Sequence, residues 1–294
     1  MKNMKNNHPI IVLAGRYPQL SLPIVQNARQ TPAYRDSVLC GEPVNKKPAF
    51  HFSEEDRLSC EQTPVGEVEV LYLALREDFI HAYRALACRC EPAEIPDSVG
   101  AVTVSGLINW EKIHRHEAEY LAAGGKDWSA EFQEFTSVKS NYLDTIILLS
   151  SGNYSDVPAA KVGLSEQDWK EKSYIIRKFH ELTHFVCRRQ YPGDLDAIRD
   201  EVIADMIGLI KAFGEYDTGL AAAFLGIEGE SYRKGGRLEY YAGNDLDGAI
   251  RQARREIDKY AALVRGQDTE DVFSLLFRVF RPEASPGAAD PDGR

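Results

Sequence analysis

The sequence predicts an α+β fold in which an N-terminal half of mixed strands and helices is followed by a helical C-terminal half. Two observations support this division. Short runs of β-branched and other apolar residues, which are typical of strands, occur within the first 151 residues. From Ser165 onward, apolar residues recur at helical spacing. The hydrophobic and charged fractions, 44% and 27%, exclude a wholly disordered, collagen-like or coiled-coil protein.

The N-terminal half begins with a segment that has no regular period. Residues 1–63 contain many Pro, Asn and Gln residues, so we expect an irregular layer packed on the body of the protein. The elements predicted after it are a strand that becomes a helix after Arg76 (68–89), a strand (101–108), a helix (110–123) and the clearest strand (142–151).

The C-terminal half begins with a strong helix signal. Ser165 and Asp168 have the spacing of a capping box, and no Gly or Pro follows until Pro192, so we expect one long helix. The helical patterns that come after this break cover residues 194–214, 245–266 and 269–280. The last two are expected to pack over the first two helices of this half.

Charge and cysteine content limit the cellular setting and the partners. There are 35 Lys and Arg residues against 45 Asp and Glu residues, and this acidic balance argues against nucleic acid or an anionic membrane as a partner. Five scattered cysteines do not form a secreted disulfide framework. The apolar stretch 10–14 is too short for a signal peptide, and no segment approaches the roughly 20 apolar residues of a membrane span. We therefore expect a cytoplasmic protein of undetermined oligomeric state.

The long predicted helix contains the motif HELTH at residues 180–184. Because an α-helix has 3.6 residues per turn, His180 and His184 lie one above the other and can both reach one metal ion. Glu181 is offset by roughly 100°, which leaves its carboxylate beside the metal rather than on it.

A zinc ion bound by two histidines still needs a third protein ligand. Glu201 and Asp205 lie four residues apart on the second predicted helix and hence on one face. A short turn between two antiparallel helices would bring that face to the histidines. Glu201 then suits the third ligand, and Asp205 suits a position behind a histidine, accepting its N–H and fixing its tautomer.

HELTH followed by Glu201-Val-Ile-Ala-Asp205 resembles the metal site of the gluzincin branch of zinc metallopeptidases, the group that includes thermolysin. The resemblance covers residues 165–214. It implies a zincin-like catalytic domain over residues 64–280. Residues 281–294 contain three prolines and few apolar groups, so we expect a disordered tail there. The metzincin branch requires a third histidine downstream, and no histidine follows His184.

The resemblance also implies an activity, namely hydrolysis of a peptide or protein substrate at a peptide or amide bond. Glu181 would be the general base that takes a proton from water activated at Zn²⁺. Thermolysin-like enzymes stabilise the oxyanion with a downstream His and a Tyr, but this chain lacks that histidine. The candidates become Arg237, Tyr240 and Tyr241, in a Gly-rich segment that could instead be an exposed loop.

Gluzincins further place an edge strand before the metal-binding helix, where an extended peptide pairs with it. Residues 148–155 lie at a suitable distance before His180. By this resemblance Gly152, Asn153 and Tyr154 would line a substrate groove, although they could equally form a plain turn at the end of a strand.

Two other functions stay open from the sequence. The first is a zinc-stabilised binding or regulatory module without hydrolytic activity, in which the fourth coordination position is closed. The second is a dinuclear carboxylate protein, because Glu181 and His184 also form a Glu-x-x-His motif. That class needs a second such motif, which the predicted helices do not supply.

Overall fold

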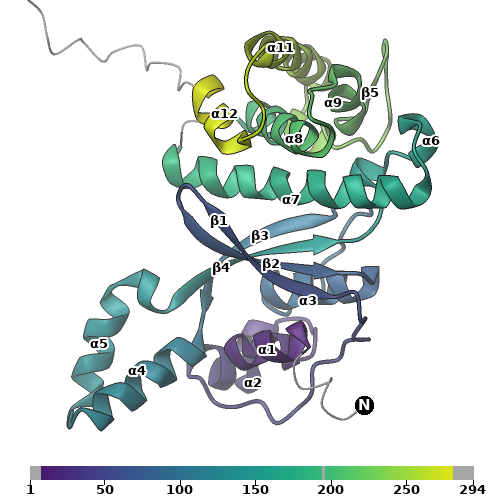
Figure 1. The fold of residues 1–294 in the computed structure, drawn as a ribbon. Coiled ribbons are helices and arrows are strands. Elements are labelled where there is room, and N and C mark those ends of the chain that lie inside the picture. The colour runs from purple at the N-terminus through teal and green to yellow at the C-terminus, as the bar shows by residue number, and fades with distance from the viewer. Residues whose placement is uncertain (1–7, 194–195, 281–294) are drawn as a thin grey trace, which may run out of the picture. The chain divides into compact units, whose positions relative to one another are not determined.

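A computed structural model of the chain describes residues 8–193 and 196–280 (Figure 1). The expected disordered tail, residues 281–294, lies outside this described part. The chain forms two compact units. The first takes the described residues up to 62 together with 66–152, and the second takes 63–65 and the described residues from 153 onward. Contacts thus divide the single domain predicted for residues 64–280 between the two units.

The first unit contains a four-stranded mixed sheet with the strand order β1-β2-β4-β3. The strands are β1 (Arg57–Thr63), β2 (Gly66–Leu73), β3 (Ala101–Ile108) and β4 (Leu143–Ser150). β4 runs parallel to β2, with Leu71 opposite Leu148, and antiparallel to β3, with Thr103 opposite Ile147. Four consecutive residues of β4, from Ile146 to Leu149, are fully buried, as expected of a central strand.

The central position of β4 corrects one expectation. We expected residues 148–155 to begin as an edge strand to which a peptide could pair. β4 instead has β2 on one side and β3 on the other, so its backbone groups are already used within the sheet. Strand order depends on contacts between distant segments, which the apolar run alone does not specify.

Among its described residues, the first unit contains five α-helices. They are α1 (Pro9–Arg16), α2 (Pro32–Tyr34), α3 (Arg76–Leu86), α4 (Trp110–Ala122) and α5 (Trp128–Ser137). The side chain of His8 accepts a hydrogen bond from the amide of Ile10, and Pro9 occupies the first turn, where its missing N–H costs nothing. Ile10 and Leu13 then join the core formed by β2, α3 and β4. Part of the segment expected to be irregular is therefore helical.

The second unit is mainly helical. Together with the sheet of the first unit, this confirms the mixed α+β class predicted from the sequence. Its helices are α6 (Ala159–Val162), α7 (Glu166–Gln190), α8 (Ala197–Phe213), α9 (Thr218–Phe224), α10 (Glu239–Ala242), α11 (Leu246–Val264) and α12 (Val272–Val279). A short hairpin is formed by β5 (Ile227–Glu228) and β6 (Ser231–Tyr232). The Ser165 hydroxyl accepts from the Asp168 amide at 3.1 Å, so Ser165 caps the start of α7 as predicted.

α7 and α8 lie side by side in the second unit, and α9, α11 and α12 pack against α8 (Figure 1). α8 is buried on all sides from Val202 to Ile210, and α7 is buried from His180 to Cys187. Gly208 allows the two backbones to approach closely, since a Cβ there would lie 2.8 Å from the carbonyl oxygen of Ile176. The HELTH turns of α7 therefore face α8 at short range.

Within the described residues, none of the helices combines the length and the apolar character that crossing a bilayer requires.

Candidate metal centre

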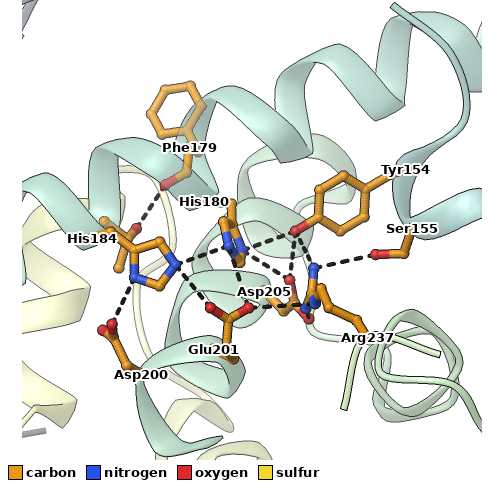
Figure 2. A network of polar contacts seen from close by, with 10 residues as sticks. Tyr154, Ser155, Phe179, His180, His184, Asp200, Glu201, Asp205 and Arg237 are labelled. Carbon is orange, nitrogen blue, oxygen red and sulfur yellow. Dashed lines mark hydrogen bonds and ion pairs between the residues drawn. The ribbon is translucent and has the colours of Figure 1, made fainter. Parts of the chain in front are cut away.

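Two helices bring together three side chains that could bind a metal ion. His180 and His184 project from α7, and Glu201 projects from α8 (Figure 2). The two Nε2 atoms are 2.9 Å apart. Glu201 Oε1 lies 3.4 Å from His184 Nε2, and its Oε2 lies 3.6 Å from His180 Nε2. All three residues are buried, and one ligand atom from each lies within 4.8 Å of the others, so the group could bind a metal ion.

The opposite nitrogen of each imidazole faces a further carboxylate of α8 (Figure 2). His180 Nδ1 is 2.9 Å from Asp205 Oδ1, and His184 Nδ1 is 2.8 Å from Asp200 Oδ2. A carboxylate at Nδ1 holds the proton on that atom and turns the Nε2 lone pair toward the centre. Asp205 therefore occupies the place behind a histidine that we predicted for it.

This arrangement fits a cation. With both Nδ1 atoms protonated toward their carboxylates, two Nε2 lone pairs and the Glu201 carboxylate converge on one small volume. Electron pairs that converge in a buried space repel one another unless a proton or a metal ion lies between them. Two imidazole nitrogens and one carboxylate are also a ligand set found at catalytic zinc sites.

The charges of the metal centre perturb its titrating groups. Burial alone would raise the pKa of Glu201, but Arg237 and the two histidines outweigh it and hold that pKa well below its usual value. Asp205 has a lowered pKa for a similar reason, with Arg237 and His180 opposing the effect of burial. Burial disfavours the charged form of His184, yet Asp200 and Glu201 raise its pKa to about 10. Both acids are thus ionised, and without a metal ion His184 holds a second proton, so that its imidazole is positively charged beside them.

A guanidinium and a phenol complete the network. Arg237 Nη1 donates to Tyr154 Oη at 2.9 Å, its Nη2 donates to Asp205 Oδ2, and its Nε lies 3.4 Å from Glu201 Oε2. The Tyr154 hydroxyl donates to Asp205 Oδ1 at 2.7 Å and lies 2.8 Å from His180 Nδ1. These contacts leave Asp205 surrounded by three partners.

The turn after Tyr154 fixes the position of its side chain. Ser155 and Asp156 both have positive φ angles, 51° and 57°, which non-glycine residues rarely adopt. The Tyr154 amide donates to Ser173 Oγ at 3.0 Å, and the Asn153 carbonyl accepts from Arg177 at 3.2 Å, so α7 holds this turn on both sides.

The remaining predicted site residues differ in burial and in their distance along the chain from the three candidate ligands. Glu181 is buried on α7, directly after His180. Burial is the main reason why the pKa of Tyr241 is raised, and the charge of Glu201 raises it further. Tyr240 is 52% exposed on α10. Gly152, with φ 100°, is the last residue of the first unit and is not among the residues of the metal centre.

Of the three residues predicted to line a groove, the structure brings Tyr154 into the metal centre. Its side chain is buried, with its hydroxyl against His180 and Asp205 and its ring against Phe224, at a centroid distance of 4.8 Å. Asn153 contributes a backbone carbonyl to Arg177 instead of a side chain to this network. Only Tyr154 of this set therefore contacts a metal-ligating residue through a described hydrogen bond.

Two residues of the centre were missed by reasoning from the sequence. Asp200 directly precedes Glu201 on the same helix. A second carboxylate beside the predicted ligand could have indicated a partner for His184 Nδ1. Ser155 accepts from Arg237 Nη1 at 3.2 Å, and no sequence pattern indicated this contact.

Comparison with known proteins places the chain in a family without assigning it an activity. Residues 1–271 match the family of unknown function DUF7005, and the chain belongs to this family. No curated protein and no solved structure matches the chain.

Proposed function

We propose that this member of the DUF7005 family is a zinc-dependent hydrolase of peptide or amide bonds, with a zincin-like catalytic region of the gluzincin type. The observation that carries the proposal is the convergence of His180 Nε2, His184 Nε2 and the Glu201 carboxylate in a buried space. Each imidazole has a carboxylate at its other nitrogen, as ligating histidines of metal sites commonly do.

The charges of the contacting residues support a divalent ion. Asp200, Glu201 and Asp205 contribute three carboxylates, whereas Arg237 contributes one guanidinium. Uncompensated charges in a buried site are costly, and two further positive charges would balance this group. Zinc is favoured over magnesium or calcium because those ions prefer sites built from oxygen ligands alone.

Bound zinc would supply a Lewis acid for the substrate carbonyl and would lower the pKa of a water molecule. His180, His184 and Glu201 would hold the ion. Glu181 would accept the proton of the attacking water and pass it to the leaving amine. Its buried position next to His180 on α7 supports this role.

The developing negative charge on the substrate needs a donor besides the metal ion. Arg237 Nε lies 3.4 Å from Glu201 Oε2 and supplies an N–H group, and the charge of Glu201 raises the pKa of Tyr241, whose phenol supplies an O–H group. Tyr240 is exposed on the neighbouring turn, where it could contact a bound peptide. We assign the oxyanion role to Arg237 or Tyr241 and a substrate contact to Tyr240.

A second candidate function is a zinc-stabilised binding module without hydrolytic activity. It is favoured by the close pairing inside the centre, where Arg237 already contacts Glu201, Asp205 and Tyr154. A structural zinc site is enclosed in this way, whereas a catalytic site keeps one position for water.

Substitution of the predicted base separates the two functions. Glu181→Gln removes the proton acceptor but none of the three ligands, so we expect it to retain zinc and to abolish cleavage of a peptide library. Glu171→Gln, an exposed change on the same helix, is the matched control and should cleave like the unmodified protein. Undiminished cleavage by Glu181→Gln would refute the mechanism. Absence of cleavage by the zinc-loaded unmodified protein would favour the binding module.

A further inference from the structure

The first unit contains a cavity that the proposed hydrolysis does not use. Its volume is about 670 Å³, within the range of small-molecule sites. Its wall is formed by the short helical turns near Gln19, Arg29 and Tyr34, by the end of α3 and by the second half of β3. All of these segments belong to the first unit, so the cavity is complete within it.

Two arginines give the cavity its charge. Arg29 and Arg89 both line it and are exposed, and neither guanidinium has a hydrogen bond or an ion pair with another residue in the part of the chain that the structure describes. Burial raises the pKa of Tyr34, which also lines the cavity, and the charges of both arginines act in the opposite direction. Glu91 also lines the cavity, but its Oε2 accepts the Asn27 amide at 2.8 Å.

The backbone holds Arg89 in an uncommon conformation. Arg89 and Cys90 have φ angles of 55° and 65°, in the left-handed region. The Cys90 amide donates to the Arg84 carbonyl at 2.8 Å, and the Cys90 carbonyl accepts from Val25 at 3.0 Å. Two consecutive residues in this region cost free energy, and such strain is often found at ligand-binding segments.

The opposite wall also departs from regular structure. The pairing of β3 with β4 shifts between Ser105 and Leu107, where Gly106 has φ 77°. Such bulges change the direction in which neighbouring side chains point and are frequent beside binding sites. Leu107 and the buried side chains of Val38 and Leu86 make this part of the lining apolar.

One buried polar atom on the wall lacks a partner. Gln19 is 4% exposed, and its Oε1 accepts no hydrogen bond from the described residues. An unpaired buried acceptor costs free energy that a donor could recover. The wall therefore combines two unpaired cationic groups, an apolar surface and an acceptor that lacks a donor.

We propose that this cavity binds a small organic anion, whose carboxylate or phosphate pairs with Arg29 and Arg89 and whose apolar part lies against Val38, Leu86 and Leu107. Guanidinium groups bind both kinds of anion through charge-assisted hydrogen bonds. A simple inorganic ion would leave most of the volume and the apolar side chains without a contact. The site is separate from the metal centre and does not depend on its activity.

Two pairs of probes distinguish a phosphate from a carboxylate ligand. The first pair is adenosine 5′-monophosphate and adenosine, and the second is indole-3-acetate and indole. Each anion is titrated calorimetrically into the full-length chain at constant ionic strength. We expect saturable binding of at least one anion, and binding of its uncharged counterpart about tenfold weaker or undetectable, as expected on loss of a charge-assisted pair.

Substitution of the two cavity arginines tests whether the anion binds in the cavity. Arg29→Ala and Arg89→Asn should each weaken it about tenfold, because each removes one charged partner. Asn tolerates the backbone conformation at position 89. Arg115→Ala, an exposed arginine of α4 outside the cavity, is the matched control and should leave the affinity unchanged. Since both cavity arginines are exposed and unpaired, neither change should unfold the protein.

The proposal is overturned if neither anion saturates, if the uncharged counterpart binds equally well, or if the Arg29 and Arg89 variants bind like the Arg115 variant. Binding that is lost on zinc removal but not in the arginine variants would place the ligand at the metal centre and also overturn it. Because the probes are titrated without a peptide substrate, failure of the proposed hydrolysis does not affect this outcome.

Discussion

Asp205 Oδ1 lies 2.9 Å from His180 Nδ1, although 24 residues separate the two in sequence. The same carboxylate accepts the Tyr154 hydroxyl and pairs with Arg237. Asp205 thereby joins His180, a candidate metal ligand, to two side chains from other segments. A residue in that position orients the imidazole and increases its basicity without touching the metal ion itself.

Asp205→Asn should weaken zinc binding by roughly 10- to 100-fold, the usual cost of losing such a partner. The amide keeps a similar shape but loses the negative charge that holds the proton on His180 Nδ1. Zinc affinity can be measured by competition with a chromophoric chelator. Asp247→Asn, an exposed change on α11, is the control and should bind zinc like the unmodified protein. Equal affinities for all three proteins would show that Asp205 does not support the ligand.

Tyr154→Phe should destabilise the fold by about 1–2 kcal/mol, because removal of the buried hydroxyl leaves Asp205 and Arg237 each without one hydrogen-bond partner. The ring contact with Phe224 is retained, so the loss reports on the hydroxyl. Urea denaturation at constant zinc concentration measures the effect. Unchanged stability would mean that the hydroxyl is not integrated in the network as described.

Chelation of zinc should lower stability without unfolding the second unit. At a free zinc concentration of 100 times Kd, linkage gives a loss of about 2.7 kcal/mol. α7 and α8 are buried against each other, so their helices should persist in far-ultraviolet circular dichroism while the melting temperature falls. Complete loss of helicity on chelation would instead support the structural zinc module.

In the first unit, Asp78 should give His51 a raised pKa that can be measured. His51 Nδ1 lies 2.9 Å from Asp78 Oδ1, and this hydrogen bond raises the pKa of His51 above 6.5. A raised folded-state pKa contributes stability below pH 6.5, and this contribution is lost as pH rises through the folded value. Histidine NMR titration should show the elevated pKa and its return toward 6.5 in Asp78→Asn. The same pKa in both proteins would contradict the pairing.

The sequence was sufficient for the parts of the metal centre that depend on local geometry. His180 and His184 share a helix, and so do Glu201 and Asp205, so a spacing of four residues places each pair on one face. The capping box at Ser165 likewise acts over three residues and correctly predicted the start of α7. In each case the relevant residues lie within one helical turn or its cap.

Other features depend on contacts between distant segments. Tyr154 reaches His180 through a turn in which two non-glycine residues have positive φ angles, and no composition signal marks such a turn. Arg237 was considered as a donor to substrate, but its pairing with Asp205 depends on how α8 and the Gly-rich segment fold together. The central position of β4 depends on strand order in the same way.

The zinc content of purified variants tests the central claim most directly. By elemental analysis we predict about one zinc ion per chain in the unmodified protein, as expected for a mononuclear site, and little or none in His184→Ala. His114→Ala, which removes an exposed histidine of α4, should retain the full content. Full zinc occupancy in His184→Ala, or no divalent metal in the unmodified protein, would contradict the assignment of His180, His184 and Glu201 as the metal site.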